Sequence, residues 1–407
     1  MAMVYPLKTI DDYDPLIGTA ALENIYQRAL PLKGRQVVHV NSTYYGGGVA
    51  EILSELTLLM NGLGIKTEWR LIKGSPDFFA ITKKFHNALQ GNRALEINDY
   101  EKAIYERTIY ENSMRKRLDH DFVIIHDPQP LPLIQYFEKK GPWIWRCHID
   151  LSSPNRPVWH YLKPYVNHYD AMIVSIREFR KKINIPQRLF MPAIDPFSLK
   201  NKDLTEEEID AQLEAYHIPT DLPLVVQVSR FDRWKDPLGV IKAFKQARKQ
   251  VDATLVLLGS AATDDPEGEQ VFESLLNHKE DRIIIISHEN NLLVNALQRK
   301  AAVVIQKSIR EGFGLTVSEA LWKGTPVIGG RVGGIRYQIR NGENGFLVSS
   351  IRETAERMVT LLKDKDMRSR MGLKGREIVR EHFLMSRLLE QYLDLMNAFE
   401  TVFRIKK

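Results

Sequence analysis

Short apolar runs rich in β-branched residues alternate with helical patterns along most of this chain. This alternation is typical of βαβ units and predicts largely parallel sheets. Several runs are apolar at consecutive positions, as expected where helices cover a parallel strand on both faces. The expected strands are 37–40, 67–71, 122–125, 144–147 and 172–174 in the first half, and 224–228, 255–258, 283–286, 303–305, 327–328 and 346–348 in the second.

The alternation breaks once, after Asp195 and Pro196, where a polar, acidic, helix-forming segment occupies residues 204–215. A chain of 407 residues also exceeds what one hydrophobic core usually organises. We therefore expect two α/β domains, residues 1–200 and 216–384, each with a Rossmann-like doubly wound sheet.

Charge and composition narrow the classes of partner. The formal charge of +6 comes from 57 basic and 51 acidic residues, spread without a long basic block, which suits a small polyanionic substrate and does not indicate nucleic acid. The one cysteine, Cys147, excludes an internal disulfide and fits a reducing compartment. No signal-peptide pattern and no apolar run near the ~20 residues of a membrane span is present. We expect a cytoplasmic protein with no membrane partner.

The loops after the strands are the expected place for chemistry, because open α/β sheets bind ligands beyond the carboxyl ends of their strands. In the first domain, Gly46, Gly47 and Gly48 follow the first strand and lead into a helix near Val49. Glycines let the backbone approach a ligand closely, and a helix N-terminus attracts anions. The alternative is a tight strand-to-helix turn without a ligand.

In the second domain, Arg230 and Lys235 follow the strand 224–228. Two fixed cations there can hold a diphosphate and offset the charge that develops on it as a bond breaks. The alternative is an ordinary solvated charged loop.

Two glutamates flank the start of a helix expected from Leu315 to Lys323. Glu311 precedes this helix, and Glu319 lies about one turn into it, with Gly314 between them exposing backbone N–H groups. The two carboxylates can therefore face one ligand at separated points, one toward sugar hydroxyls and the other toward ribose hydroxyls. Alternatives are helix-stabilising glutamates or a glycosidase-type acid and base pair, although the spacing favours substrate binding.

These features together resemble the retaining GT-B glycosyltransferases of family 4: two glutamates with seven residues between them, the upstream Arg230 and Lys235, the glycine loop, and the segment 192–195. The resemblance covers nearly the whole chain. It implies two Rossmann-like doubly wound domains facing a central cleft, an acceptor-side domain 1–200 and a nucleotide-sugar-binding domain 216–384. It also implies that a C-terminal helix, 385–407, packs back on the first domain, the alternative being a helix on its own domain.

Four segments of the first domain resemble the trehalose glycosyltransferring synthases, which join nucleotide-activated glucose to free glucose. They are 39–43, 85–91, 126–130 and 145–150. The same segments also resemble the trehalose phosphorylases, so the reaction stays open between these two and a family 4 transferase with another acceptor. A non-enzymatic binding module is disfavoured because all four charged residues of the second-domain site are present.

The resemblance assigns roles on the donor side. Arg230 and Lys235 would hold the donor diphosphate, and Glu319 the ribose. Glu311 would bind hydroxyls of the transferred sugar, and further donor contacts would come from Phe313, Gly314 and Leu315 through their N–H groups and from the glycine loop, Gly46, Gly47 and Gly48. Family 4 membership implies transfer with retention, no protein nucleophile and no obligatory metal or cofactor. UDP-, ADP- and GDP-glucose all stay open as the donor.

Other residues fall to the acceptor side. His148, at a strand end, would lie over the donor sugar and act in catalysis with Arg230, Lys235 and Glu311. Contacts to the acceptor sugar would come from Asp127, Asp150, His86 and Asn87. For each histidine the alternative is a satisfied core or loop residue. The expected partners are small sugars, and the oligomeric state stays open, a homodimer included.

Overall fold

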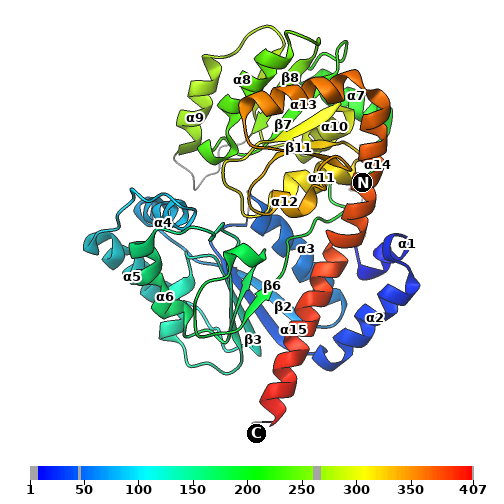
Figure 1. Cartoon of the computed structure of the whole chain (residues 1–407). Coiled ribbons are helices and arrows are strands. Elements are labelled where there is room, and N and C mark those ends of the chain that lie inside the picture. Colours follow the sequence, from blue (N-terminus) through cyan, green and yellow to red (C-terminus); the bar gives the residue numbers. More distant parts are fainter. Residues whose placement is uncertain (1–7, 45–46, 260–266, 406–407) are drawn as a thin grey trace. The chain divides into compact units, whose positions relative to one another are not determined.

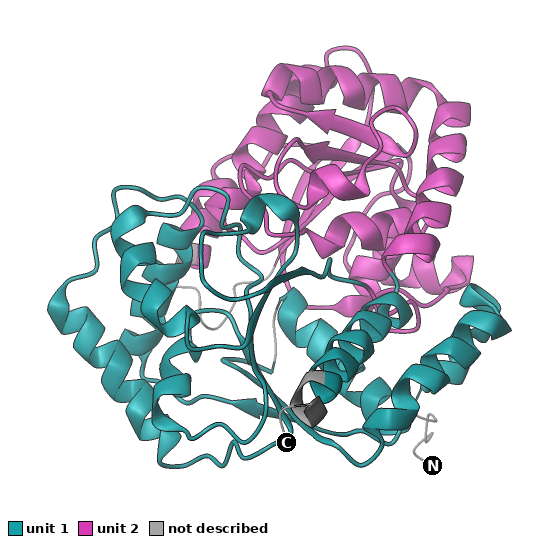
Figure 2. Ribbon diagram, turned by 60° about the horizontal axis from the view of Figure 1, so that its bottom comes forward, with its two compact units in different colours: residues 1–193, 384–407 teal, residues 194–383 magenta. Residues whose placement is uncertain are grey.

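The computed structural model describes residues 8–44, 47–259 and 267–405 (Figure 1). Contacts divide the chain into two compact units, one of residues 1–193 with 384–407 and one of residues 194–383 (Figure 2). The chain therefore passes between the units twice. Residues 194–200 belong to the second unit, and the C-terminal helix belongs to the first.

The first unit is built on a six-stranded parallel sheet of order β2-β1-β3-β4-β5-β6. Its strands are β1 (Gln36–Asn41), β2 (Lys66–Leu71), β3 (Phe122–His126), β4 (Trp143–Arg146), β5 (Ala171–Val174) and β6 (Gln187–Leu189). The first five strands confirm the predicted runs to within one residue at either end. The strand β6 was not predicted, because it has three residues and none of them is buried.

Helices connect the parallel strands of this sheet. The α-helices are α1 (Asp14–Ile17), α2 (Thr19–Ala29), α3 (Gly48–Gly62), α4 (Pro76–Leu89), α5 (Asp99–Ser113), α6 (Arg156–Val166) and α15 (Met385–Ile405), and the 3-10 turns are η1 (Ile10–Tyr13), η2 (Leu30–Leu32), η3 (Leu131–Tyr136) and η4 (Arg177–Phe179). The long C-terminal helix α15 packs beside α2 and α3 (Figure 1).

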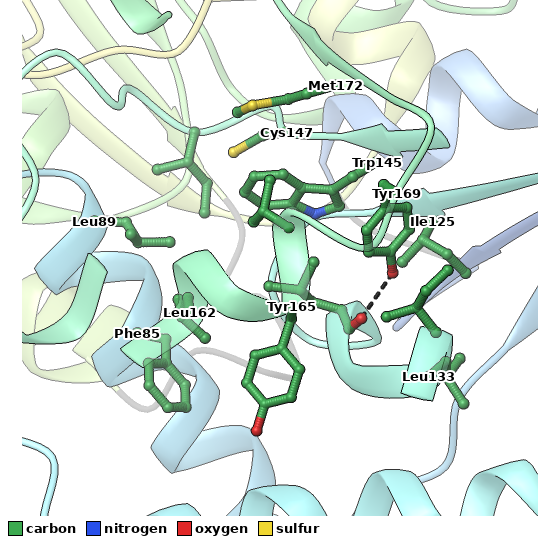
Figure 3. Packing of buried hydrophobic residues seen from close by; sticks show 14 of the residues in the cluster. Phe85, Leu89, Ile125, Leu133, Trp145, Cys147, Leu162, Tyr165, Tyr169 and Met172 are labelled. Atoms are coloured by element: carbon green, nitrogen blue, oxygen red, sulfur yellow. Dashed lines mark hydrogen bonds between the residues drawn. The ribbon is translucent and has the colours of Figure 1, made fainter. Parts of the chain in front are cut away.

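One face of the first sheet is apolar. Alternate residues of the central strands, such as Ile125 and Trp145, pack with Phe85 and Leu162 from α4 and α6 in one buried cluster that also holds Cys147 (Figure 3). A hydroxyl that reaches this core, Tyr169, donates to the carbonyl of Leu131 at 2.7 Å, so its burial leaves no hydrogen bond unmade.

The opposite face of the same sheet carries polar side chains at its centre. The residues His39 in β1, His126 in β3 and Arg146 in β4 are buried there, since successive side chains of a strand alternate between the two faces. The Tyr392 ring of α15 lies over them, with its centroid 5.9 Å from that of His39. The first unit therefore has one apolar face and one face with a buried polar cluster.

The second unit repeats the architecture with a six-stranded parallel sheet of order β12-β11-β10-β7-β8-β9. Its strands are β7 (Leu224–Val228), β8 (Thr254–Gly259), β9 (Ile283–Ser287), β10 (Val303–Gln306), β11 (Val327–Gly330) and β12 (Gly345–Val348), and all six confirm predicted runs to within two residues. This is the doubly wound order in which the direction of winding reverses between β7 and β10.

The helices of the second unit lie on both faces of its sheet (Figure 1). They are α7 (Glu206–Ala215), α8 (Pro237–Ala247), α9 (Glu267–Leu276), α10 (Asn291–Lys300), α11 (Leu315–Trp322), α12 (Ile335–Gln338), α13 (Ile351–Lys363) and α14 (Lys365–His382), with the 3-10 turn η5 (Arg233–Lys235). Within the described parts of both units, no helix has the length and apolar character needed to cross a membrane.

Candidate active site

The loops after β7 and β10 meet at the point where the strand order of the second sheet reverses. The backbone N–H of Ile309 donates to the carbonyl of Trp234 at 2.7 Å, and the Gln227 side chain donates to the carbonyl of Lys235 at 3.0 Å. These bonds fix one loop against the other. They bring together Lys235 and Glu311, which are 76 residues apart in the sequence.

The ammonium of Lys235 donates to Oε2 of Glu311 at 2.5 Å. The same oxygen accepts from the Ser308 hydroxyl at 3.0 Å and from the Gln306 amide at 3.4 Å. The side chains of the ion pair are only 17% and 10% exposed, so water screens their attraction weakly. From the sequence we assign Lys235 to a phosphate and Glu311 to a sugar, and in the structure the two side chains bind each other.

Ser308 and Gln306 were not among the predicted site residues. Gln306 is the last residue of β10, Ser308 follows two residues later, and both donate to the Glu311 carboxylate. A polar residue at the end of an apolar strand was the sequence signal that could have identified Gln306.

A second stretch that the prediction missed, Gly333 and Gly334 after β11, packs against the Glu311 loop. A Cβ on Gly333 would lie 1.7 Å from the carbonyl oxygen of Glu311, and one on Gly334 would lie 2.5 Å from the Cα of Phe313. Two backbones therefore approach as closely as they do only because these positions have no side chain. The Gln338 amide adds a bond of 2.7 Å to the carbonyl of Phe313.

The helix α11 begins at Leu315, and Gly314 is its N-cap with a φ of +82°. Phe313 is buried, with its ring 5.6 Å from that of Phe383. Glu319 lies one turn into the helix and is 3% exposed, with Oε1 3.8 Å from the ammonium of Lys200. The two predicted glutamates thus differ in environment, because each faces a different lysine.

Arg230 follows β7 and is the most exposed of the predicted charged residues in this unit. Its guanidinium lies 3.7 Å from the carboxylate of Asp232, whose other oxygen accepts from the backbone N–H of Trp234 at 2.8 Å. The aspartate therefore orients Arg230 and the turn η5 together, on the loop that also carries Lys235.

In the first unit, three histidines form a hydrogen-bonded chain across neighbouring strands. Nδ1 of His39 lies 3.0 Å from Nε2 of His126, and Nδ1 of His126 lies 3.0 Å from Nε2 of His148, which follows β4. Burial lowers the pKa of His39 to about 3. Burial also holds the pKa values of His126 and His148 well below the ordinary value, and the nearby Arg146 cation adds to this. All three rings are therefore neutral near pH 7.

Asp127 lies beside this chain in a left-handed backbone conformation, with a φ of +60°. Its carboxylate accepts from the backbone N–H of His148 at 2.7 Å, and its carbonyl accepts from the Trp145 ring N–H at 2.9 Å. Burial raises the pKa of Asp127 to about 7, although the bond from His148 and the charge of Arg146 oppose the shift. A carboxyl group that titrates near neutrality, next to a neutral histidine, is typical of a functional site.

The other predicted residues of this unit lie on separate elements. Asp150 is buried and accepts from the backbone N–H of Ser152 at 2.8 Å. His86 and Asn87 are in the last turn of α4, and the side chain of Asn87 is buried. After β1, Gly47 is the N-cap of α3 with a φ of +89° and Gly48 is the first residue of that helix, whereas Gly46 lies outside the described residues.

No group of three or more histidine, cysteine, aspartate or glutamate side chains that could hold a metal ion occurs among residues 8–44, 47–259 and 267–405.

The buried histidines give a testable dependence of stability on pH. Unfolded histidine binds a proton near pH 6.5, whereas folded His39 stays neutral down to about pH 3. The unfolded state therefore binds more protons in this window, and the free energy of unfolding should fall by about 1.4 kcal/mol per pH unit for each such histidine as the pH decreases from 6.5. Asp127 has a folded pKa of about 7, above its unfolded value. Its protonation should therefore raise the free energy of unfolding as the pH decreases from about 7 to about 4.

Urea denaturation at several values between pH 6.5 and 4.5 measures this slope. His39→Asn should make it shallower by about 1.4 kcal/mol per pH unit, whatever its effect on absolute stability. An unchanged slope in this variant would contradict the neutral state of His39.

Residues 39–181 match the family model described as the N-terminal domain of trehalose synthase, and residues 208–378 match glycosyl transferases group 1. Trehalose synthase from Pyrococcus horikoshii is 44% identical over 402 residues, which are 96% of each chain. This chain belongs to the trehalose synthase family. It is a glycosyltransferase, and the predicted family and enzyme class are confirmed.

Two proteins of lower sequence identity are also similar to this chain. Trehalose phosphorylase from Grifola frondosa is 27% identical over 91% of this chain and 58% of its own length. A solved structure of the UDP-forming α,α-trehalose-phosphate synthase from Burkholderia xenovorans, with glucose 6-phosphate, covers 89% of this chain and all of its own, with a TM-score of 0.71 at 14% identity. That likeness and the two doubly wound sheets confirm the predicted GT-B fold class.

Proposed function

We propose that this glycosyltransferase moves glucose from a nucleotide-diphosphate glucose to free glucose and forms α,α-trehalose reversibly, with retention at the transferred carbon. The observation that carries the proposal is the 44% identity with a trehalose synthase over 96% of both chains. The paired Lys235 and Glu311 at the reversal point of the second sheet support it, because ligands of doubly wound sheets bind there.

The second unit is the proposed donor side. Arg230 and Lys235 would hold the diphosphate, and the N–H groups of Phe313, Gly314 and Leu315 would add hydrogen bonds at the start of α11. The Lys235 ammonium has three donors, so it can keep one bond to Glu311 while it turns another toward a phosphate oxygen.

Glu311 and Glu319 have separate proposed partners. Glu311, held by Lys235 and Ser308, would accept from hydroxyls of the transferred sugar. Glu319, buried beside Lys200, would accept from the ribose. The nucleotide base stays open between uridine, adenosine and guanosine.

The proposed reaction is a same-face displacement. As the bond from the sugar to the diphosphate breaks, positive charge develops on the sugar and negative charge on the departing phosphate, which Lys235 and Arg230 stabilise. The departing phosphate oxygen accepts the proton of the attacking hydroxyl on the same face. In this scheme no protein side chain forms a bond to the sugar, and no metal ion is required.

The first unit is the proposed acceptor side. His148 would lie over the donor sugar, and the acceptor glucose would be bound by Asp127 and Asp150, with His86 and Asn87 from the end of α4. The buried carboxyls of Asp127 and Asp150 support this role, since a carboxylate with little competing water discriminates well between hydroxyl positions. Small sugars are the proposed partners of a cytoplasmic enzyme.

A donor-by-acceptor screen tests the proposal. Purified protein is incubated with UDP-, ADP- or GDP-glucose and with glucose or glucose 6-phosphate, and the products are analysed by proton NMR at the anomeric positions. We expect α,α-trehalose from free glucose with at least one donor. Product from glucose 6-phosphate alone would refute the acceptor, a β-linkage would refute retention, and no turnover with any donor would favour a binding module.

A phosphorylase is the second candidate, because the Grifola frondosa phosphorylase aligns with 91% of this chain. Incubation of the protein with trehalose and either inorganic phosphate or a nucleoside diphosphate separates the two reactions by product. Glucose 1-phosphate would identify a phosphorylase, and a nucleotide-diphosphate glucose would identify the synthase reaction in reverse.

A further inference from the structure

The three linked histidines must all point their protons in the same direction. A neutral imidazole has one N–H and one lone pair. Since His126 bonds to His39 through Nε2 and to His148 through Nδ1, it accepts from one neighbour and donates to the other. The chain therefore has two arrangements: every N–H points toward His148, or every N–H points toward His39.

The buried end of the chain selects between these arrangements. His39 is fully buried, and its Nε2 has no hydrogen-bond partner among the described residues. If the protons pointed toward His39, this nitrogen would carry a buried N–H without an acceptor. Orphaned buried N–H groups are rarer in proteins than acceptors that lack a donor, so the bare lone pair belongs on Nε2 of His39 and the protons point toward His148.

The open end of the chain lies at His148, the only one of the three that is not fully buried. Its Nε2 is taken by His126, and its backbone N–H is held by the Asp127 carboxylate at 2.7 Å. The residue is thus held once at its ring and once at its backbone, and Nδ1 is the ring nitrogen left for a ligand.

We propose that His126 and His39 are positioning residues that lock His148 in the tautomer with its proton on Nδ1. His148 is then a neutral hydrogen-bond donor to a ligand oxygen and cannot act as a general base. The tautomer follows from the histidine chain alone; only the identity of the oxygen, a hydroxyl of the donor sugar, rests on the proposed function.

Imidazole nitrogen NMR tests the tautomer in the full-length protein without substrate. Protein labelled with ¹⁵N-histidine gives distinct two-bond correlation patterns for the two neutral tautomers, and His148→Gln identifies the His148 signal. We expect the Nδ1–H pattern, which is the minor form of free neutral histidine. An Nε2–H pattern for His148 in the folded wild-type protein would overturn the proposal.

The variant His126→Leu removes the donor to His148 and should return its signal to the common Nε2–H pattern. Turnover should fall about tenfold, the scale of one lost hydrogen bond to the reacting groups, with a smaller change in KM. His126→Gln, whose amide can donate in place of Nδ1, should recover part of that loss. A His126→Leu protein that keeps both the wild-type tautomer and the wild-type kcat would refute the positioning role.

The readouts separate this inference from the proposed function. A His148 signal with the Nδ1–H pattern in a protein that has no trehalose-forming activity would refute the proposed function alone. Normal trehalose formation with an Nε2–H pattern would refute the tautomer alone. If His126→Leu does not fold, as judged by circular dichroism, the wild-type spectrum still decides the tautomer.

Discussion

Replacing Lys235 by alanine is expected to lower turnover by a factor on the order of 10² to 10³, the scale for removing one preorganised stabiliser of developing charge. The Lys235 ammonium, 17% exposed and 2.5 Å from Glu311, is held at the reversal point of the second sheet. Little reorganisation is therefore needed when charge develops on the leaving group. Steady-state kinetics with the best donor and acceptor measure the loss, and circular dichroism checks the fold.

Lys245→Ala is the matched control for this variant. Lys245 lies in the same unit and also binds a glutamate, Glu280, at 2.5 Å, but both partners are more exposed. Exposed pairs contribute little to stability, and Lys245 is not among the proposed site residues. This variant should therefore keep wild-type turnover. Equal losses in both variants, or near-normal turnover in Lys235→Ala, would refute the assignment.

A double variant separates two roles of Lys235. The reference is Glu311→Gln alone, because Glu311 is itself proposed to bind the transferred sugar. If Lys235 serves only to neutralise Glu311, the double variant should have the turnover of Glu311→Gln alone. If Lys235 stabilises the leaving group, the turnover of the double variant should fall well below that of Glu311→Gln alone.

Much of the fold could be predicted because each central strand is an apolar run between helices. The residues 224–228 were assigned as a strand from their sequence and form β7 without any change of boundary. The edge strand β6 could not be predicted, for a physical reason. Gln187 and Arg188 pair with β5 through their backbones and bury little side-chain surface, so no hydrophobic pattern marks them.

The site could be predicted only in part. The loop positions of Lys235 and Glu311 follow from the rule that chemistry lies beyond the strand ends. The direct contact between Lys235 and Glu311 could not be predicted, because it depends on β10 lying next to β7. Neither segment contains a signal for that strand order. A sequence pattern gives the period of a strand and the face of each side chain, but it does not name the neighbouring strand.

The histidine chain shows the same limit. Each of His39 and His126 follows a run of apolar residues within its strand, which was a visible signal of a special role. Their contact requires β1 to pair with β3, and that of His126 with His148 requires β3 to pair with β4. Only with the sheet order known does the alternation of side chains place all three rings on one face.

Gly333→Ala is expected to disrupt the site through the backbone alone. The added Cβ would lie 1.7 Å from the carbonyl oxygen of Glu311, so one of the two loops must move. Because Glu311 binds Lys235, such a shift displaces both charged groups of the pair. A displacement of about 1 Å in a reacting constellation costs on the order of 10²-fold in turnover. We expect that loss, and a decrease of about 2 kcal/mol or more in the free energy of unfolding.

Gly342→Ala isolates the part of this effect that comes from backbone strain. Gly342 also has a positive φ, +86° against +43° for Gly333, but a Cβ there meets no atom within 4 Å. Its alanine variant should lose about 1 kcal/mol of stability and keep wild-type turnover. If the two variants lose activity equally, left-handed strain in the unit explains the result, and close contact between Gly333 and Glu311 does not. If only Gly333→Ala loses activity, the distance between two backbones sets the position of the Glu311 carboxylate and, through it, of the Lys235 ammonium.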